Sequence, residues 1–179
     1  MRVISGIYKG RQLEGHELKN TRPTMERVKE SLFAMLQNEI KESTVLDLFA
    51  GSGNLGIEAL SEGAKKAYFV DSNKDAIKTI KKNLEALSCK DQTVLWMDYK
   101  KALKELEGTK FNMIFLDPPY QTNYIEESIK DIKRYQLLEK KGKIICESDQ
   151  PDKIIYPDSY HPVKEKKYGD KYIVILEEI

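Results

Sequence analysis

The tetrapeptide Asp117-Pro118-Pro119-Tyr120 follows the apolar run 111–116, and its residue types suggest chemistry on an exocyclic amine. Such an amine is a poor nucleophile because its lone pair is delocalised, so an enzyme must hold its N–H groups with acceptors. Two successive prolines lack N–H groups and favour an extended residue before them, which predicts a rigid turn with exposed carbonyls. We therefore expect Asp117 and the Pro118 carbonyl to bind the amine, and Tyr120 to stack on an extruded base. An ordinary turn at a strand end would use the same residue types.

A second motif covers residues 45–56, where an apolar strand runs into a glycine loop and then into an amphipathic helix. Gly51 and Gly53 allow a tight turn, Gly56 allows close packing of the helix on the strand, and the helix N-terminus offers N–H groups. This pattern predicts a nucleotide-type cofactor at the end of the strand. Asp71 ends the next apolar strand, where a carboxylate can bind two ribose hydroxyls.

Two further carboxylates bear on the choice of cofactor. A dinucleotide-dependent dehydrogenase would show the same glycines and the same acid at position 71. Asp47, however, would repel a pyrophosphate, whereas it suits the ammonium and sulfonium charges of S-adenosylmethionine. Asp47 could instead be a buried carboxylate satisfied by backbone N–H groups. Asp98 follows the strand 93–96 and could bind the adenine amine or cap the next helix.

Taken together, these motifs resemble the bacterial family that methylates N2 of a guanine in small-subunit (16S) ribosomal RNA. The matching stretches are 1–6, 8–11, 21–24, 27–33, 46–60 and 117–120. The glycine loop and the Asp-Pro-Pro-Tyr turn are shared with many amine methyltransferases, whereas Thr21-Arg22-Pro23-Thr24 is more particular to this family. The resemblance implies S-adenosylmethionine on the glycine loop and a flipped guanine on Tyr120.

The resemblance also implies that an N-terminal β-hairpin and the segment 22–29 hold the RNA. The candidate contacts are Arg2, Lys9, Arg11, Arg22 and Arg27. Charge agrees with this prediction, because residues 1–29 contain seven basic and three acidic side chains, a local net charge of +4, while the whole chain carries only +1. A solvated basic face would give the same pattern.

Strands and helices alternate along the rest of the chain, as expected for a parallel sheet covered by helices. We predict strands at 44–49, 66–70, 93–96 and 111–116, helices at 54–62, 74–87, 99–106 and 124–135, and final strands near 143–146 and 172–176. By resemblance, the last strand is antiparallel. The sequence thus predicts an α/β fold, a Rossmann-like class I S-adenosylmethionine-dependent methyltransferase sheet.

The N-terminal part is predicted as a small β-hairpin extension made of residues 2–5 and 11–13 around Lys9-Gly10. A helix then begins with Thr24 as its N-cap, and we expect Arg27 and Lys29 to remain outside its apolar face. The apolar positions of this helix are Val28, Leu32, Met35, Leu36 and Ile40. We expect one methyltransferase domain over residues 1–179, in which 1–23 form the RNA-binding extension and 24–179 the catalytic core.

Composition limits the other possibilities. A chain of 179 residues with 40% hydrophobic side chains can bury a sizeable core without disulfides. The two cysteines and two histidines match no metal-ligand or disulfide spacing, so we expect no metal. No apolar run is long enough to span a membrane. We expect a soluble, cytoplasmic monomer whose partner is small-subunit ribosomal RNA, by resemblance within an assembling ribosomal particle.

Three alternatives remain open at the level of sequence. The same motifs fit an adenine-N6 methyltransferase acting on DNA or RNA, although site selection would then call for a further recognition domain. A protein-amide methyltransferase usually has Asn at the first position of the tetrapeptide, where this chain has Asp117. A non-catalytic RNA-binding module that keeps the fold would explain the basic N-terminus, but not the cofactor loop and the amine-binding turn together.

Overall fold

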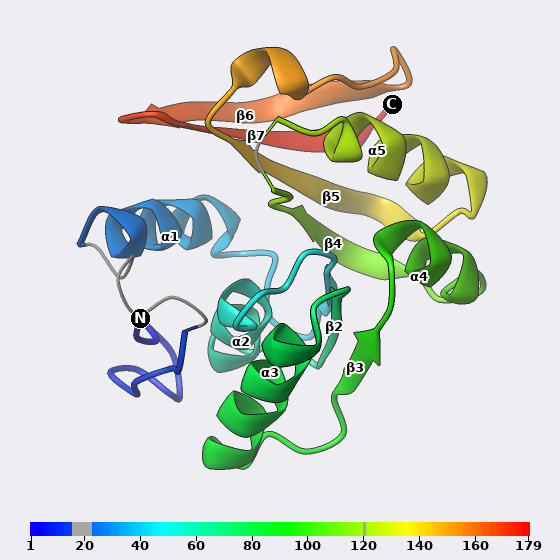
Figure 1. Ribbon diagram of the computed structural model, residues 1–179. Coiled ribbons are helices and arrows are strands. Elements are labelled where there is room, and N and C mark those ends of the chain that lie inside the picture. Colours follow the sequence, from blue (N-terminus) through cyan, green and yellow to red (C-terminus); the bar gives the residue numbers. More distant parts are fainter. Residues whose placement is uncertain (16–22, 120) are drawn as a thin grey trace.

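The computed structural model describes residues 1–15, 23–119 and 121–179, and its centre is a seven-stranded sheet in the order β3-β2-β1-β4-β5-β7-β6 (Figure 1). The strands are β1 (Thr44–Asp47), β2 (Lys66–Asp71), β3 (Thr93–Trp96), β4 (Phe111–Leu116), β5 (Leu138–Ser148), β6 (Tyr160–Tyr168) and β7 (Lys171–Glu178). Strands β1 to β5 pair in parallel, and β7 lies antiparallel between β5 and β6.

Helices cover both faces of the sheet, as the continuous apolar strands require. On one face lie α1 (Pro23–Leu36), α2 (Asn54–Ser61) and α3 (Lys74–Ala86), and on the other α4 (Tyr99–Glu105) and α5 (Tyr124–Arg134). A 3₁₀ turn, η2 (Pro151–Lys153), precedes β6. Two apolar clusters result, with Leu32, Ile57, Phe69 and Ile80 buried on the first face, and Leu103, Ile114, Ile129 and Ile144 on the second.

The alternating part of the chain follows the sequence prediction to within two residues at each boundary. The last two predicted strands correspond to β5 and β7, and β7 is antiparallel to β5 as expected. Strand β6 was missed. It is an edge strand whose residues are mostly exposed and include Pro162, so it lacks the apolar alternation that marks a strand.

The N-terminal extension forms a hairpin that is shorter than predicted. The Val3 N–H donates to the Arg11 carbonyl at 3.0 Å, the Gly10 N–H to the Val3 carbonyl at 2.9 Å, and the Leu13 N–H to the Met1 carbonyl at 2.8 Å. Within residues 1–15, Arg2 and Gln12 form an isolated antiparallel bridge, and turns occupy most of the segment between them. The hairpin is also fastened to the end of α2, since the hydroxyl of Ser61 accepts from the Tyr8 N–H at 2.9 Å. Gly6 is required at this contact, because a Cβ there would lie 2.0 Å from the Ser61 carbonyl oxygen.

Two expectations about α1 were wrong. The helix begins at Pro23, a position that suits proline, so Thr24 lies inside it and is not its N-cap. Lys29 is not outside, since only 2% of its surface is exposed. It lies four residues before Phe33 and seven before Leu36, both buried, so helical spacing places it on the packed face.

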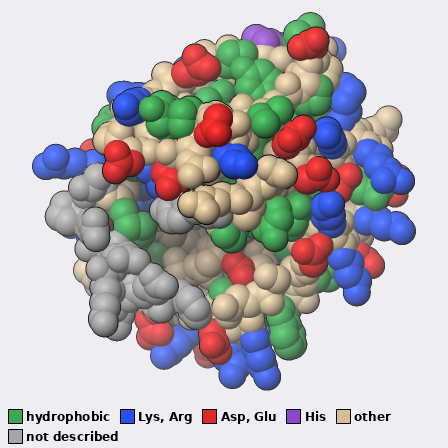
Figure 2. Space-filling model, turned by 45° about the horizontal axis from the view of Figure 1, so that its top comes forward, with side chains coloured by type: hydrophobic (Ala, Val, Ile, Leu, Met, Phe, Trp, Pro, Cys, Tyr) green, Lys and Arg blue, Asp and Glu red, His purple; other side chains and the backbone are tan. Residues whose placement is uncertain are grey.

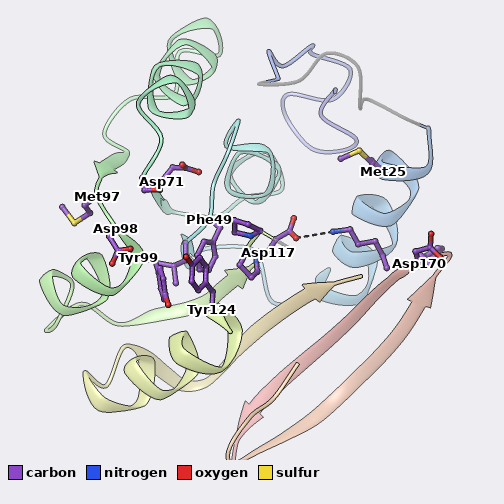
Figure 3. A pocket seen from close by; sticks show the side chains of 15 residues that line it. Met25, Phe49, Asp71, Met97, Asp98, Tyr99, Asp117, Tyr124 and Asp170 are labelled. Carbon is purple, nitrogen blue, oxygen red and sulfur yellow. Dashed lines mark hydrogen bonds and ion pairs between the residues drawn. The ribbon is translucent and has the colours of Figure 1, made fainter. Parts of the chain in front are cut away.

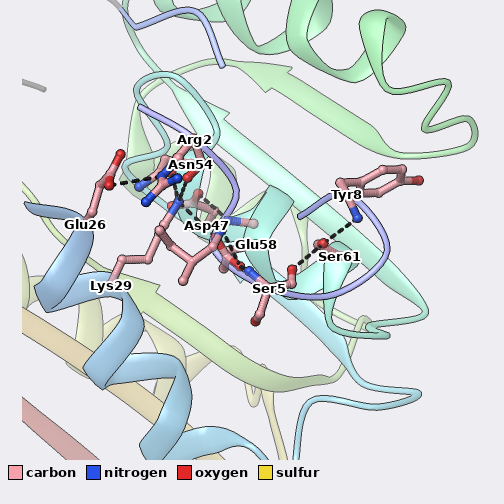
Figure 4. A network of polar contacts seen from close by, with 11 residues as sticks. Arg2, Ser5, Tyr8, Glu26, Lys29, Asp47, Asn54, Glu58 and Ser61 are labelled. Carbon is pink, nitrogen blue, oxygen red and sulfur yellow. Dashed lines mark hydrogen bonds and ion pairs between the residues drawn. The ribbon is translucent and has the colours of Figure 1, made fainter. Parts of the chain in front are cut away.

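A buried ion pair accounts for Lys29 (Figure 4). Its Nζ lies 2.9 Å from Oε1 of Glu58 in α2 and donates to the Asn54 side chain at 2.7 Å and to the Arg2 carbonyl at 2.6 Å. The carboxylate of Glu58 also accepts from the backbone N–H groups of residues 4 and 5. The network therefore joins the N-terminal segment, α1 and the first residue of α2, which follows the glycine loop directly.

Candidate active site

A cleft of about 650 Å³ opens at the carboxyl edge of the sheet, where parallel α/β sheets bind their ligands. Asp71, Asp98 and Asp117, which end or follow β2, β3 and β4, all line it (Figure 3). A smaller cavity of about 260 Å³ adjoins it and is lined by the glycine loop, Asp47 and Glu147. Both cavities share Asp117, so the predicted cofactor and amine sites meet at this residue.

The glycine loop has the conformation that its sequence predicts. Gly51 and Gly53 have φ angles of 58° and 84°, which side chains rarely adopt. A Cβ on Gly51 would meet nothing within 4 Å, whereas one on Gly56 would lie 2.4 Å from the ring of Phe69 in β2. Gly56 therefore brings α2 close to the sheet, and Gly51 lines the smaller cavity.

Asp71 holds the glycine loop and also faces the cleft. Its Oδ2 accepts from the Gly51 N–H at 2.9 Å, and its Oδ1 accepts from the Asn73 N–H at 2.9 Å. A carboxylate oxygen has two lone-pair sites, so each oxygen can accept one further hydrogen bond from a ligand hydroxyl. The loop contact was not foreseen from the sequence.

Asp98 is the N-cap of α4, since its side chain accepts from the Lys100 N–H at 3.0 Å. This is one of the two roles that the sequence left open. The same side chain lines the cleft next to Met97, so capping leaves it accessible to a ligand.

Asp47 is buried, and its Oδ2 accepts from the Gly56 N–H at 3.0 Å. Burial raises the pKa of this carboxyl to about 7, the Gly56 hydrogen bond opposes the shift, and the charges of Asp117 and Asp71 add to it. The backbone-satisfied carboxylate considered from the sequence is therefore present. A cation in the adjoining cavity would favour its ionised form.

The turn that begins with Asp117 follows β4, and the Asp117 side chain is half-exposed. Oδ1 of Asp117 lies 3.3 Å from Nζ of Lys171 at the start of β7, and Pro118 and Pro119 line the cleft beside it. The Pro119 carbonyl accepts from the Thr122 hydroxyl at 2.9 Å. Tyr120, the proposed stacking residue, lies outside the described residues.

Three aromatic side chains at the cleft were missed from the sequence. Phe49, Tyr99 and Tyr124 have ring centroids 4.6 to 6.0 Å apart, and the rings of Phe49 and Tyr124 stack at 9°. They come from the loop after β1 and from the first residues of α4 and α5, and they lie between Asp98 and Asp117 in Figure 3. Each of the three residues lies at or after the end of a predicted strand in the sequence. This position could have indicated that they lie at the cleft.

Glu147, near the end of β5, was also missed. It is 6% exposed, lines the smaller cavity with Asp47 and Asp117, and has its pKa raised to about 8, chiefly by burial and then by the charge of Asp117. Asp47 and Asp71 were identified as acidic residues at the ends of apolar strands. Glu147 has a similar position in β5, so it could have been predicted from the sequence.

The RNA-binding candidates fall in two places. Arg2, Lys9 and Arg27 line a surface cavity of about 430 Å³, in which Arg2 pairs with Glu26 at 3.2 Å. Arg11 lies elsewhere and donates to the Ala86 carbonyl at the end of α3, at 2.8 Å. Arg22 lies outside the described residues. Basic and acidic side chains are interspersed over the face in Figure 2, so no extended single-sign surface is visible there.

Within the described ranges, no group of three or more His, Cys, Asp or Glu side chains is placed to hold a metal ion. None of the helices that the structure describes is long and apolar enough to cross a membrane.

Comparison with known proteins places the chain in a family. Residues 1–177 match the family described as "Conserved hypothetical protein 95". The "Putative rRNA methyltransferase YlbH" of Bacillus subtilis is 45% identical over 153 residues, which cover 84% of this chain and 83% of that protein. The "Ribosomal RNA small subunit methyltransferase D" of Haemophilus influenzae is 37% identical over 172 residues, with 94% and 89% coverage.

Among solved structures, the "Putative methyltransferase yhhF from Escherichia coli" superposes with a TM-score of 0.89 at 31% identity, covering 99% of this chain and 97% of that one. The predicted Rossmann-like class I methyltransferase fold is therefore confirmed, and so is the family resemblance. The chain belongs to the family that these small-subunit ribosomal RNA methyltransferase D relatives share.

Proposed function

We propose that this chain is an S-adenosylmethionine-dependent methyltransferase that modifies the exocyclic N2 amine of a guanine in small-subunit ribosomal RNA. The observation that carries this proposal is the meeting of Asp71, Asp98 and Asp117 in one cleft, with the glycine loop beside it. The family relatives named as small-subunit ribosomal RNA methyltransferases supply the substrate class. The N2 atom of guanine comes from the sequence resemblance.

The residues around the glycine loop fit S-adenosylmethionine. Asp47 and Asp117 place carboxyl groups around the smaller cavity, which suits the ammonium and sulfonium charges of the aminoacyl end. Asp71 lies where the ribose hydroxyls would bind, and Asp98 with Met97 where the adenine would. A pyrophosphate would meet the same carboxylates with repulsion, which argues against a dinucleotide. When bound, the cofactor supplies an electrophilic methyl group carried on a positively charged sulfur.

Catalysis in this proposal is mainly positioning. Asp117 and the Pro118 carbonyl each accept a hydrogen bond from one N–H group of the guanine amine. These two bonds orient the lone pair of the amine toward the cofactor side of the cleft. Tyr120 stacks on the extruded base. As the N–C bond forms, the amine becomes acidic, and Asp117 is the adjacent group that can take its proton.

The RNA is held, in this proposal, by the N-terminal extension. Arg2, Lys9 and Arg27 share one surface cavity and can contact phosphates, whereas Arg11 and Arg22 are further candidates. We further propose that residues 1–23 serve as this extension and residues 24–179 as the catalytic core of one domain. The protein would act as a monomer in the cytoplasm, where ribosomal particles assemble.

A methylation assay tests the proposal. Small ribosomal particles from cells that lack this enzyme are incubated with the chain and labelled S-adenosylmethionine, and the RNA is digested to nucleosides. Labelled N2-methylguanosine is the expected product. N6-methyladenosine would favour the adenine alternative, and no labelled nucleoside in particles or in free RNA would favour a non-catalytic module. The Asp117→Ala variant is the control for contaminating activity.

A further inference from the structure

Glu147 is a buried acid that the mechanism above does not use. In the pairing of β4 with β5, Leu116 lies opposite Cys146, so Asp117 and Glu147 follow this pair on adjacent parallel strands. The Glu147 side chain is 6% exposed and lines the smaller cavity together with Asp117. A carboxyl group at this depth must be neutral or closely partnered, since an isolated buried charge is costly.

The groups that face Glu147 come from several elements. Asp117 follows β4, Asp47 ends β1 and Lys171 begins β7, while Lys29 of α1 lines the same cavity. Burial, the charge of Asp117 and a hydrogen bond with its side chain raise the pKa of Glu147 to about 8, Lys171 opposes the shift, and Asp47 adds to it. The raised pKa favours the protonated Glu147 carboxyl, a form that can donate a hydrogen bond.

We propose that Glu147 is a positioning residue for the amine-binding turn, donating a hydrogen bond from its neutral carboxyl to Asp117. Lys171 holds the same carboxylate through the 3.3 Å contact to Oδ1. Held by both, Asp117 keeps one orientation, and its remaining lone pairs point into the cleft. This inference rests on the proposed function, because it assigns Glu147 to the orientation of the residue that binds the guanine amine.

Ionisation of Glu147 makes the turnover rate depend on pH. When Glu147 loses its proton, Asp117 loses a hydrogen-bond donor and gains a like charge beside it. Asp117 then turns away from the amine, so turnover falls as the pH rises through about 8. Glutamine has the shape of the neutral acid and keeps an N–H donor at every pH, so it can replace the protonated form.

Single-turnover methylation of small ribosomal particles between pH 6 and 9.5 tests this with Glu147→Gln and Glu147→Ala. The control is Glu177→Gln in β7, a glutamate paired with Lys143 in the middle of β5. We expect Glu147→Ala to lower the rate at pH 7 roughly 10-fold or more, the scale of one hydrogen bond to a charged group. Glu147→Gln should stay within about three-fold of the wild type at pH 7 and lose the decline above pH 8. The control should keep the wild-type profile.

Two results would overturn the inference while leaving the proposed function intact. One is an unchanged alkaline decline in Glu147→Gln, and the other is a rate for Glu147→Gln as low as that of Glu147→Ala at pH 7. No product from the wild-type enzyme would instead overturn the proposed function, and this inference with it.

Thermal unfolding gives a readout that needs no substrate. A carboxyl whose folded pKa is raised keeps its proton in the native state after the unfolded chain has ionised, so its contribution to stability falls as the pH rises from about 4.5 to about 8. The Tm of Glu147→Gln should therefore rise relative to the wild type between pH 5 and 8.5. The raised pKa of Asp47 acts in both proteins and cancels in this difference. A Tm difference independent of pH would show that Glu147 is already ionised, and the inference would fail.

Discussion

Two clusters of buried charged groups in this molecule are built in opposite ways. Beside α1, the ammonium of Lys29 has three acceptors and the carboxylate of Glu58 has three donors, with 2% and 1% of their side chains exposed. At the ends of β1, β4 and β5, three acids, Asp47, Asp117 and Glu147, line one cavity together with Lys171 and with Lys29 itself.

The difference separates a structural role from a functional one. In the Lys29–Glu58 cluster each charge has a full set of partners, so the pair can fasten the N-terminal segment and α1 to α2. In the acidic cluster, Lys29 is already paired with Glu58, so three carboxyls face Lys171, and burial first raises the pKa values of Asp47 and Glu147 to about 7 and about 8. An excess of acid that folding alone does not require suits a site that receives a cationic ligand and an amine.

The largest effect on the free energy of unfolding should come from breaking the Lys29–Glu58 ion pair. Replacement of Lys29 by Met leaves the Glu58 carboxylate buried without its cation, which should lower the free energy of unfolding by about 3–5 kcal/mol. Denaturant unfolding measures this. Lys82→Met, which breaks an exposed pair with Glu14, is the matched control and should change stability little. The double variant Lys29→Met/Glu58→Gln should recover part of the lost free energy of unfolding. If Lys82→Met and Lys29→Met lose equal amounts of this free energy, the pair has no structural role.

In the acidic cluster, Asp117→Ala should act on turnover rather than on folding. Loss of one oriented polar group lowers turnover roughly 10²-fold or more, whereas affinity for S-adenosylmethionine should stay within a few-fold. Calorimetry and single-turnover methylation separate the two quantities. Asp152→Ala in the η2 turn, away from the cleft, is the control. A near-normal rate for Asp117→Ala would show that this residue has no part in the mechanism. The acidic cluster would then lack the functional role that distinguishes it from the Lys29–Glu58 pair.

A third change tests the cofactor side of the cleft. Asp71→Ala removes the proposed contact with the ribose hydroxyls and the hydrogen bond to Gly51, so it should weaken binding of S-adenosylmethionine by roughly 1.5–3 kcal/mol in the absence of RNA. Calorimetry with S-adenosylmethionine and, in parallel, with NAD measures it. If the variant binds S-adenosylmethionine normally but loses affinity for NAD, the dinucleotide reading of the glycine loop is the correct one.

The smallest effect per residue is expected on the exposed surface. Replacing Arg2, Lys9 and Arg27 together by Gln should weaken RNA binding and flatten its salt dependence by about one unit of log–log slope per lost phosphate contact. Binding isotherms at several salt concentrations measure the slope, and cofactor binding should be unchanged. The control replaces three exposed lysines by Gln, namely Lys101 and Lys104 of α4 and Lys140 of β5. Equal slopes in both triple variants would place the RNA elsewhere on the molecule.

The sequence by itself determined the elements and most of the cleft. Strands β1 to β4 and helices α2 to α5 could be predicted because apolar periodicity is a local property. Parallel strands then carry their closing acids to one edge, so Asp47, Asp71 and Asp117 had to meet there. The edge strand β6 escaped prediction because its exposed, Lys-rich residues carry no apolar alternation.

Tertiary structure alone decided the ionisation and the partners of the charged groups. Lys29 and Arg27 are both basic residues of α1, yet Lys29 is buried against Glu58, 29 residues later, while Arg27 is exposed. The pKa of Glu147 is raised first by burial and then by Asp117 and Asp47, which lie beside it in the fold but far away along the chain. Burial and electrostatic fields depend on what packs across a contact, and one chain segment does not specify its distant neighbours.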